Sequence, residues 1–325
     1  MSESPYLSDR YRETSRTTLH AIVTALSGAL ATNRQVVSLA VMTLAAGGHL
    51  LLEDVPGIGK TTLARALART ISAQVSRIQF TSDMLPSDIT GVTVFDQGAR
   101  EFTFFRGPVF AEIVLADEIN RANPKAQAAL LEAMEERRVT VDGTTYELPR
   151  PFIVIATQNP VEMEGTYPLP EAQLDRFMTR TSLGYPTPQA EARMLISPSG
   201  RDPVGALKPV CTAGDMRAII QTAAHIHVSQ TVAAYAVSLL SATRNSPQYR
   251  LGASPRAGLA LLAMSRVRAL MQGQDSVFPG DVRAMAIPVL SHRLVLADSA
   301  YGSTASERDQ ALDSLLARVP APRGA

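Results

Sequence analysis

Hydrophobic and polar positions in the first 185 residues follow two spacings, one typical of buried strands and one typical of helices. Short apolar runs predict strands at 76–80, 112–116, 152–157 and 180–183, after an earlier one within 47–57. Helical spacing predicts helices over 19–31, over 34–46 and from near Lys60 onward. A further helix is predicted after Asn123 and Pro124, a natural cap and first residue. This alternation predicts an α/β fold with a mainly parallel sheet covered on both faces.

Two hairpins interrupt this alternation. The segment "VTVDGTTYEL" is centred on Asp142 and Gly143, a strong signal for a type I′ turn. The segment "GVTVFDQGAREFTFF" predicts a second, looser hairpin.

The pattern changes near residue 185. The segments "YPTPQ" and "SPSGRDPVGALKP" are rich in Pro and Gly and indicate connections, and the rest is predicted to be helical to about 317. We therefore predict five regions: a flexible polar arm (1–18), an α/β core (19–185), a linker with the first segment of a second domain (186–210), a smaller all-helical domain (211–317) and a disordered tail (318–325).

Composition narrows the functional classes. The chain has 31 basic and 30 acidic residues, which argues against a broad basic surface for nucleic acid. A single cysteine, Cys211, permits no intrachain disulfide and no cysteine zinc site, and we interpret it as a small inert apolar group. The polar start has no apolar signal-peptide region, and the apolar run over 36–52 is too short and too interrupted for a membrane span. We expect a cytoplasmic protein.

The segment "DVPGIGKT" at 54–61 matches the phosphate-loop pattern G-x-x-x-x-G-K-[ST] except that Asp54 replaces the first glycine. Lys60 would reach the β- and γ-phosphates of a nucleotide, and the Thr61 hydroxyl would ligate Mg²⁺. The alternative is a tight turn between strand and helix, which leaves a lysine between a glycine and two threonines unexplained. The residues we predict to bind nucleotide here are Pro56, Gly57, Ile58, Gly59, Lys60, Thr61 and Thr62.

Two further strands end in polar residues. In "EIVLADEIN", Asp117 suits the Mg²⁺ shell and Glu118 suits polarisation of an attacking water, although acidic residues also occur where a strand simply meets solvent. In "IVIATQNP", the neutral polar residues 157–159 are able to hold a water near the γ-phosphate. For Asn159 the alternative is an ordinary loop residue before Pro160.

Two arginines are further candidates for anion contacts. Arg176 follows Asp175, so an ion pair between these two is the simpler interpretation. Arg256 lies just after Ser254 and Pro255, at a predicted helix start, where a cation opposes the helix dipole. A bound anion would relieve that conflict.

Five longer stretches lie between residues 47 and 257: "GGHLLLEDVPGIGKT", "RIQFTSDMLPSDITG", "ADEINRANPKAQAALLEAMEE", "ATQNPVEMEGTYPLPEAQLDRF" and "GASPRA". Together they resemble MoxR-type AAA+ ATPases, of the clade with an insert in helix 2. In that family an acidic residue often precedes V-P-G, so the resemblance implies that Asp54 leaves the ATP site intact.

The resemblance implies an AAA+ P-loop core followed by a helical lid, with ATP and Mg²⁺ as cofactors. It assigns Asn159 as sensor 1, Arg256 as sensor 2 and Arg176 as an arginine finger inserted into a neighbouring subunit. An arginine supplied by a neighbour requires oligomers, and the family suggests a hexameric ring. The hairpins would be the helix-2 insert and the hairpin before sensor 1. They would face the pore or the substrate, or else pack on their own sheet.

The function implied by the resemblance is an ATP-driven, chaperone-like remodelling machine acting on protein clients. Its partner would be a separate von Willebrand factor A-domain protein. Two alternatives stay open: an AAA+ nucleic-acid motor, which the near-neutral charge disfavours, and a nucleotide-gated scaffold that does not hydrolyse ATP.

Overall fold

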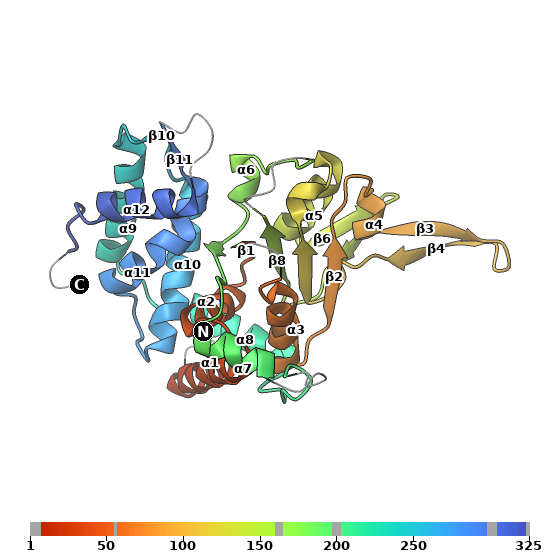
Figure 1. The fold of residues 1–325 in the computed structure, drawn as a ribbon, viewed down its shortest axis with the longest axis horizontal. Helices are drawn as coiled ribbons and strands as arrows, with labels where there is room; N and C mark the ends of the chain where they lie inside the picture. The colour runs from red at the N-terminus through yellow and green to blue at the C-terminus, as the bar shows by residue number, and fades with distance from the viewer. Residues whose placement is uncertain (1–7, 55–56, 160–164, 197–202, 298–303, 323–325) are drawn as a thin grey trace, which may run out of the picture.

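A sheet-containing half and a helical half lie side by side in this chain (Figure 1). The structure, a computed structural model, describes residues 8–54, 57–159, 165–196, 203–297 and 304–322. Within these ranges no helix is both long enough and apolar enough to cross a membrane.

Five parallel strands form the central sheet in the order β2-β5-β8-β1-β9. The predicted parallel sheet is confirmed. The four strands with predicted bounds differ from them by no more than two residues at either end, and the first strand lies within the predicted 47–57. Because all five strands run the same way, their carboxyl ends share one edge of the sheet, here called the carboxyl edge, and their starts share the amino edge. The strands are β1 (Leu50–Glu53), β2 (Val75–Gln79), β5 (Ile113–Asp117), β8 (Ile153–Gln158) and β9 (Thr179–Thr181).

Alternate strand residues face two separate cores, as a pleated sheet requires. Leu50 and Leu52 belong to one core together with α3 (Lys60–Thr70), whereas Leu51 belongs to the other together with α5 (Pro124–Glu136). The predicted cover on both faces is therefore present.

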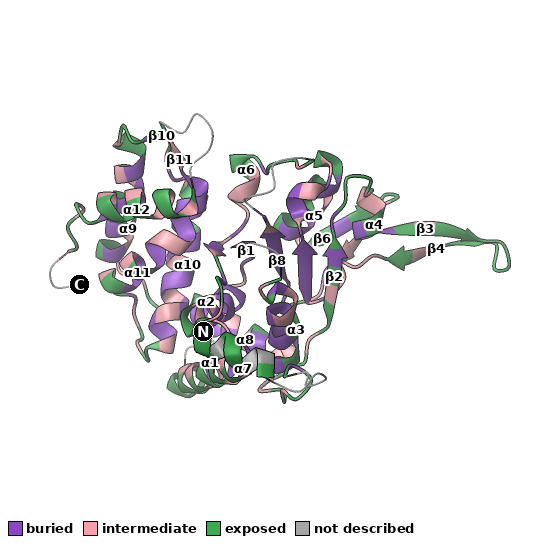
Figure 2. Cartoon of the chain, viewed as in Figure 1, coloured by how far each residue is buried: buried purple, intermediate pink, exposed green. Residues whose placement is uncertain are grey.

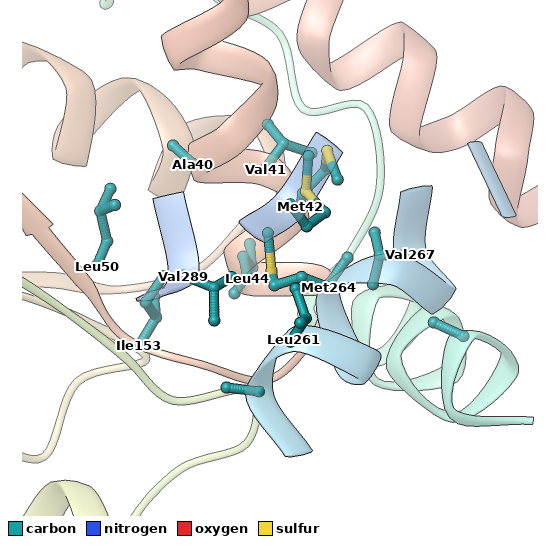
Figure 3. Close-up of a cluster of buried hydrophobic side chains, with 14 of the residues drawn as sticks. Ala40, Val41, Met42, Leu44, Leu50, Ile153, Leu261, Met264, Val267 and Val289 are labelled. Atoms are coloured by element: carbon teal, nitrogen blue, oxygen red, sulfur yellow. The ribbon is translucent and has the colours of Figure 1, made fainter. Parts of the chain in front are cut away.

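The helical half shares its core with the sheet. Side chains from α2 (Arg34–Ala45), β1, β8, α10 (Pro255–Met271) and α11 (Pro279–Leu290) meet in one apolar cluster (Figure 3). Met42, Leu261 and Met264 are almost fully buried there. The two halves therefore pack through a continuous apolar contact. The other long helices of this half are α8 (Ala213–Ala224), α9 (Gln230–Asn245) and α12 (Ala305–Leu316), and α11 continues into the 3-10 helix η3 (Ser291–Arg293).

Both predicted hairpins are present. They are β3–β4 (Gly91–Asp96 and Glu101–Arg106), which follows the short helix α4 (Pro86–Thr90), and β6–β7 (Arg138–Val141 and Thr144–Glu147). Asp142 and Gly143 have φ values of 50° and 76°, as a type I′ turn needs. The two hairpins meet where Phe104 stacks on Tyr146 at 4.3 Å between ring centres. The outer part of β3–β4 projects from the body and is exposed (Figure 2).

The predicted polar arm over 1–18 is wrong for its second half. Helix α1 (Asp9–Ala29) begins ten residues before the predicted helix, and the side chain of Ser8 caps it by accepting a hydrogen bond from the Tyr11 amide. The first turns are almost entirely exposed, so their polar sequence gave no apolar spacing to recognise. Residues 1–7 lie outside the described residues.

The predicted boundaries in the second half also need correction. Helix α7 (Pro188–Ile196) occupies part of the predicted linker, and a small antiparallel pair, β10 (Tyr249–Leu251) and β11 (Val295–Leu296), interrupts the domain predicted to be wholly helical. Val319, inside the predicted disordered tail, packs against the core, while 323–325 lie outside the described residues. The β10–β11 pair and the packing of Val319 depend on contacts between distant segments, which local spacing does not report.

Candidate functional site

The predicted phosphate loop joins β1 to α3 at the carboxyl edge. Gly57 and Gly59 have φ values of 86° and 95°, a left-handed conformation that glycine adopts without strain. In the described part of the chain no side chain caps the start of α3, so its first amide groups are open to an anion. The Lys60 side chain is 7% exposed, and its Nζ donates to the Asp54 carbonyl oxygen at 3.3 Å. Pro56 lies outside the described residues.

Asp117 ends β5 at the same edge and is nearly buried. Its Oδ1 accepts a hydrogen bond from the Thr157 hydroxyl at 2.7 Å. Its Oδ2 is 2.7 Å from Nη2 of Arg77 on β2, a guanidinium that is half exposed. The carboxylate is therefore held in one orientation, with a cation already beside one oxygen.

Glu118 is a non-glycine residue in the left-handed region, with φ 58° and ψ 50°. Such a conformation costs free energy and persists only where its surroundings impose it. The Glu118 amide donates to Thr157 Oγ1 at 2.8 Å, and its Oε2 accepts from Gln79 Nε2 at 3.0 Å. Arg121, in the 3-10 helix η2 (Ile119–Arg121), places Nε 3.1 Å from the same oxygen. The backbone conformation therefore sets the direction of the Glu118 side chain, and the contacts of Oε2 with Gln79 and Arg121 hold it there.

The predicted water-holding residues at 157–159 separate into different positions. Thr157 bonds to Asp117 and to the amide of Glu118, and Gln158 Nε2 donates to Glu53 at 2.9 Å. Asn159, which is buried, directly follows β8, the strand between β1 and β5 in the sheet. Asn159 is therefore the member of the group that lies between the phosphate loop and the acidic pair.

These residues fit a nucleotide with Mg²⁺. The uncapped helix start and the left-handed glycines suit phosphate oxygens, and Lys60 supplies a nearly buried cation. The Thr61 hydroxyl and the Asp117 carboxylate are the hard oxygen ligands that Mg²⁺ prefers. An ion there would share Asp117 with Arg77.

Arg176 and Arg256 come together at the other edge of the sheet. Arg176 Nε lies 2.8 Å from Glu135 Oε2, and Arg256 Nη2 lies 2.5 Å from Glu135 Oε1. Arg176, and then Arg256, hold the pKa of the Glu135 carboxyl below its usual range. The simpler interpretation of Arg176, an ion pair with Asp175, is wrong, since Asp175 instead contacts Arg293 and Ser254.

This cluster opens into a cavity of about 310 Å³ at the amino edge. Four arginines and two carboxylates line it, which gives an excess of positive charge: Arg137, Arg176, Arg256 and Arg293, with Glu135 and Asp175. The Arg293 side chain is only 3% exposed, and its Nη1 finds no hydrogen-bond partner among the described residues. The cavity is suited to an anion.

The sheet separates this cavity from the phosphate loop of the same chain. Gly48 and His49, which precede β1, line the cavity, whereas the loop follows β1. Helix α5 runs from the carboxyl edge to the amino edge over 13 residues, a rise of about 20 Å, and Glu135 is its second-last residue. Thus Lys60, Asp117, Glu118 and Asn159 share one edge, and Arg176 and Arg256 share the other.

Several residues around the site were not recognised from the sequence. Arg77 and Gln79 point to the same face of β2, and the register places Gln79 opposite Asp117. The only signal in the sequence was that these two polar residues alternate with Ile78 along the strand. Glu135 showed no signal, because an acidic residue near the end of a helix is ordinary. Burial raises the pKa of the Cys211 thiol to about 11, which fits its interpretation as an inert group.

Comparison with known proteins gives consistent matches. Residues 49–179 match the family described as "ATPase family associated with various cellular activities (AAA)", and residues 241–314 match the AAA lid domain. Chaperone MoxR1 of Mycobacterium tuberculosis is 45% identical over 271 residues, 81% of this chain and 71% of that protein. The uncharacterized protein YeaC of Bacillus subtilis is 44% identical over 88% of this chain and 89% of its own. A solved structure from Cytophaga hutchinsonii is 33% identical, with a TM-score of 0.86 over 96% of this chain and 97% of that one.

Proposed function

The chain belongs to the MoxR family of AAA+ ATPases, and we propose that it works as an oligomeric machine that uses ATP hydrolysis to remodel protein clients. ATPase activity and nucleotide binding follow from the family. The roles of individual residues, the oligomer and the client are our proposal. The observation that supports it is that the phosphate loop and the acidic pair lie at one edge of the sheet, whereas Arg176 and Arg256 lie at the opposite edge.

In the proposed mechanism, the loop residues 57–62 hold the phosphates of ATP through backbone amides at the start of α3. Lys60 exchanges its bond to the Asp54 carbonyl for the β- and γ-phosphates. The exchange is favourable because a buried ammonium group gains an anionic partner in place of a carbonyl.

The acidic pair supplies the chemistry of hydrolysis. Asp117 and Thr61 would hold Mg²⁺, which neutralises phosphate charge when bound. Glu118 accepts a proton from the attacking water, and Asn159 positions that water relative to the γ-phosphate. The bonds from Thr157 and Gln79 fix the direction of the Glu118 carboxylate, so little reorganisation is needed during the reaction.

Arg176 and Arg256 would complete the site of a neighbouring subunit. Both line the cavity at the amino edge, whereas the phosphate loop of their own chain follows β1 at the carboxyl edge, so the sheet lies between them and that loop. In a ring, the amino edge of one subunit would face the carboxyl edge of the next, and the arginines would leave Glu135 for the γ-phosphate. Arginines supplied in this way can accelerate phosphoryl transfer by about 10³–10⁵. We propose a hexamer as the closed form.

The client would be a protein, by analogy with the relative named a chaperone. The outer part of β3–β4 is a suitable contact for it, because Phe95 and Phe102 are 48% and 73% exposed there. We propose a separate von Willebrand factor A-domain protein as the partner. We place the machine in the cytoplasm, where ATP is supplied.

The proposal is tested by ATPase activity per subunit, measured against protein concentration and in mixtures of wild type with Arg176→Ala. Shared sites predict that activity rises with concentration and that the variant lowers it by more than dilution does. The matched control is Arg138→Ala, since the ion pair of Arg138 with Glu136 lies outside the cavity. Activity that is independent of concentration and only diluted by Arg176→Ala would disprove the shared site.

A further inference from the structure

Two consecutive buried carboxylates end β1 immediately before the phosphate loop. The Glu53 side chain is 8% exposed and Asp54 is 6% exposed. Burying an ionised carboxylate costs several kcal/mol unless other groups bond to it. The groups that bond to these two side chains therefore show which segments they connect to the end of β1.

Asp54 joins the loop to the start of the connection that leads out of the sheet. Its carboxylate accepts hydrogen bonds from Ser182 Oγ at 2.5 Å, from the Leu183 amide at 2.6 Å and from the Gly184 amide at 3.3 Å. These three residues directly follow β9 and lead toward the helical half. Its carbonyl oxygen meanwhile accepts from Lys60. One residue therefore bonds both to the phosphate-binding lysine and to the path into the helical half.

Glu53 joins the same strand end to the last helix. Its Oε2 lies 3.2 Å from Arg180 Nη1 on β9 and 3.0 Å from Arg308 Nη2 on α12. Its Oε1 accepts from Gln158, the residue before Asn159. Asp309 on α12 also pairs with Arg180, so two carboxylates balance two guanidinium groups in this network. Helix α12 is thereby fixed to the strand that carries the phosphate loop.

We propose that Glu53 and Asp54 are positioning residues that couple the phosphate loop to the helical half of the molecule. The inference rests on the proposed phosphate contacts of residues 57–62. When Lys60 leaves the Asp54 carbonyl for a phosphate, the end of β1 loses a hydrogen bond and can shift. Asp54 would pass this shift to residues 182–184, and Glu53 would pass it to α12. Because coupling between two equilibria is reciprocal, weakening the contact with α12 weakens nucleotide binding at the loop.

Replacing Arg308 by methionine tests the coupling from its far end. Arg308→Met keeps an apolar stem but removes the charge that reaches Glu53. We expect the Kd for a fluorescent ADP analogue, measured without hydrolysis, to rise at least about fivefold, the lower end of typical coupling between sites. Arg308→Lys retains a cation and should restore part of the affinity.

Arg283→Met is the matched control. Arg283 also binds α12, through Asp313 at 2.7 Å, but contacts neither Glu53 nor Asp54. It should destabilise α12 while leaving the Kd within about twofold of wild type. Equal Kd values for wild type and folded Arg308→Met, or equal losses in Arg308→Met and Arg283→Met, would overturn the inference.

Asp54→Gly is a second test that does not depend on α12. It creates the general phosphate-loop pattern, yet the proposal predicts weaker nucleotide binding because the three donors at 182–184 lose their acceptor. Binding as tight as wild type would overturn the role of Asp54. Failure of the wild-type chain itself to bind the analogue would instead refute the proposed phosphate site.

Discussion

The buried histidine at the amino edge makes the stability of the fold sensitive to acid. His49 is 5% exposed, its Nδ1 accepts from the Val154 amide at 2.9 Å, and its Nε2 lies 3.2 Å from the Met134 carbonyl oxygen. These partners require the neutral ring with its proton on Nε2, because a second proton on Nδ1 would face an N–H group. Burial, and then the charge of Arg137, lower the pKa of His49 from 6.5 to about 3.

The size and sign of the effect follow from this difference in pKa. Between pH 6.5 and 3 the unfolded chain binds a proton at His49 that the folded chain does not bind. The contribution of the neutral ring to stability is therefore complete above pH 6.5 and is lost as the pH falls. From pH 7.5 to pH 4.5 the loss amounts to about 3 kcal/mol.

The measurement is the free energy of unfolding, from urea titrations at several pH values between 7.5 and 4.5, for wild type and His49→Gln. Glutamine offers one donor and one acceptor but does not titrate. Other groups also titrate in this range, among them the carboxylates and His292, and burial lowers the pKa of His292 as well. These groups are present in both proteins, so their contribution cancels in the comparison. The difference in the free energy of unfolding between wild type and His49→Gln should therefore shrink on acidification by about 3 kcal/mol. A gap that stays constant with pH would show that His49 is not held neutral in the fold.

Three substitutions at the carboxyl edge test the assigned roles. Lys60→Ala should abolish binding of a fluorescent ADP analogue, and retained binding would contradict the phosphate contact. Glu118→Gln should bind ATP but hydrolyse it about 10²–10⁴ times more slowly in a phosphate-release assay, so unchanged turnover would remove Glu118 as the base. Thr157→Val leaves the Glu118 amide and Asp117 Oδ1 without a partner. It should lower the free energy of unfolding by about 1–3 kcal/mol and raise the Mg²⁺ requirement, whereas the exposed Thr145→Val should do neither.

The site residues at the carboxyl edge could be predicted from the sequence because each is marked by the residues next to it in the chain. Each predicted site residue there lies at the end of an apolar run or at a glycine turn, and parallel strands bring such ends together. Lys60 and Asp117 are placed in this way without knowledge of any distant contact. Arg77 and Gln79 were missed, since a polar residue in a strand acquires a partner only once the register with β5 is known.

The amino edge could not be predicted, because it is built by packing between distant segments. Arg256 begins α10 and Glu135 lies near the end of α5, and only the docking of the helical half brings them together. The first turns of α1 were missed for a related reason. Residues such as Arg10 and Glu13 face solvent, so the helix there is maintained by the Ser8 cap and by the packing of its later residues.

Helix α5 gives the proposed ring a physical link between successive sites. It begins beside the acidic pair, where Asn123 caps it and donates to the Met84 carbonyl oxygen at 2.8 Å, and it ends at Glu135. In the proposed ring, a shift of α5 at its start would move Glu135 near its end, where Glu135 bonds to both arginines. Glu135 holds both arginines, and their release to a neighbouring phosphate would leave its carboxylate without either guanidinium. In the proposed ring, each subunit would therefore report the state of its own nucleotide to the next through the position of Glu135.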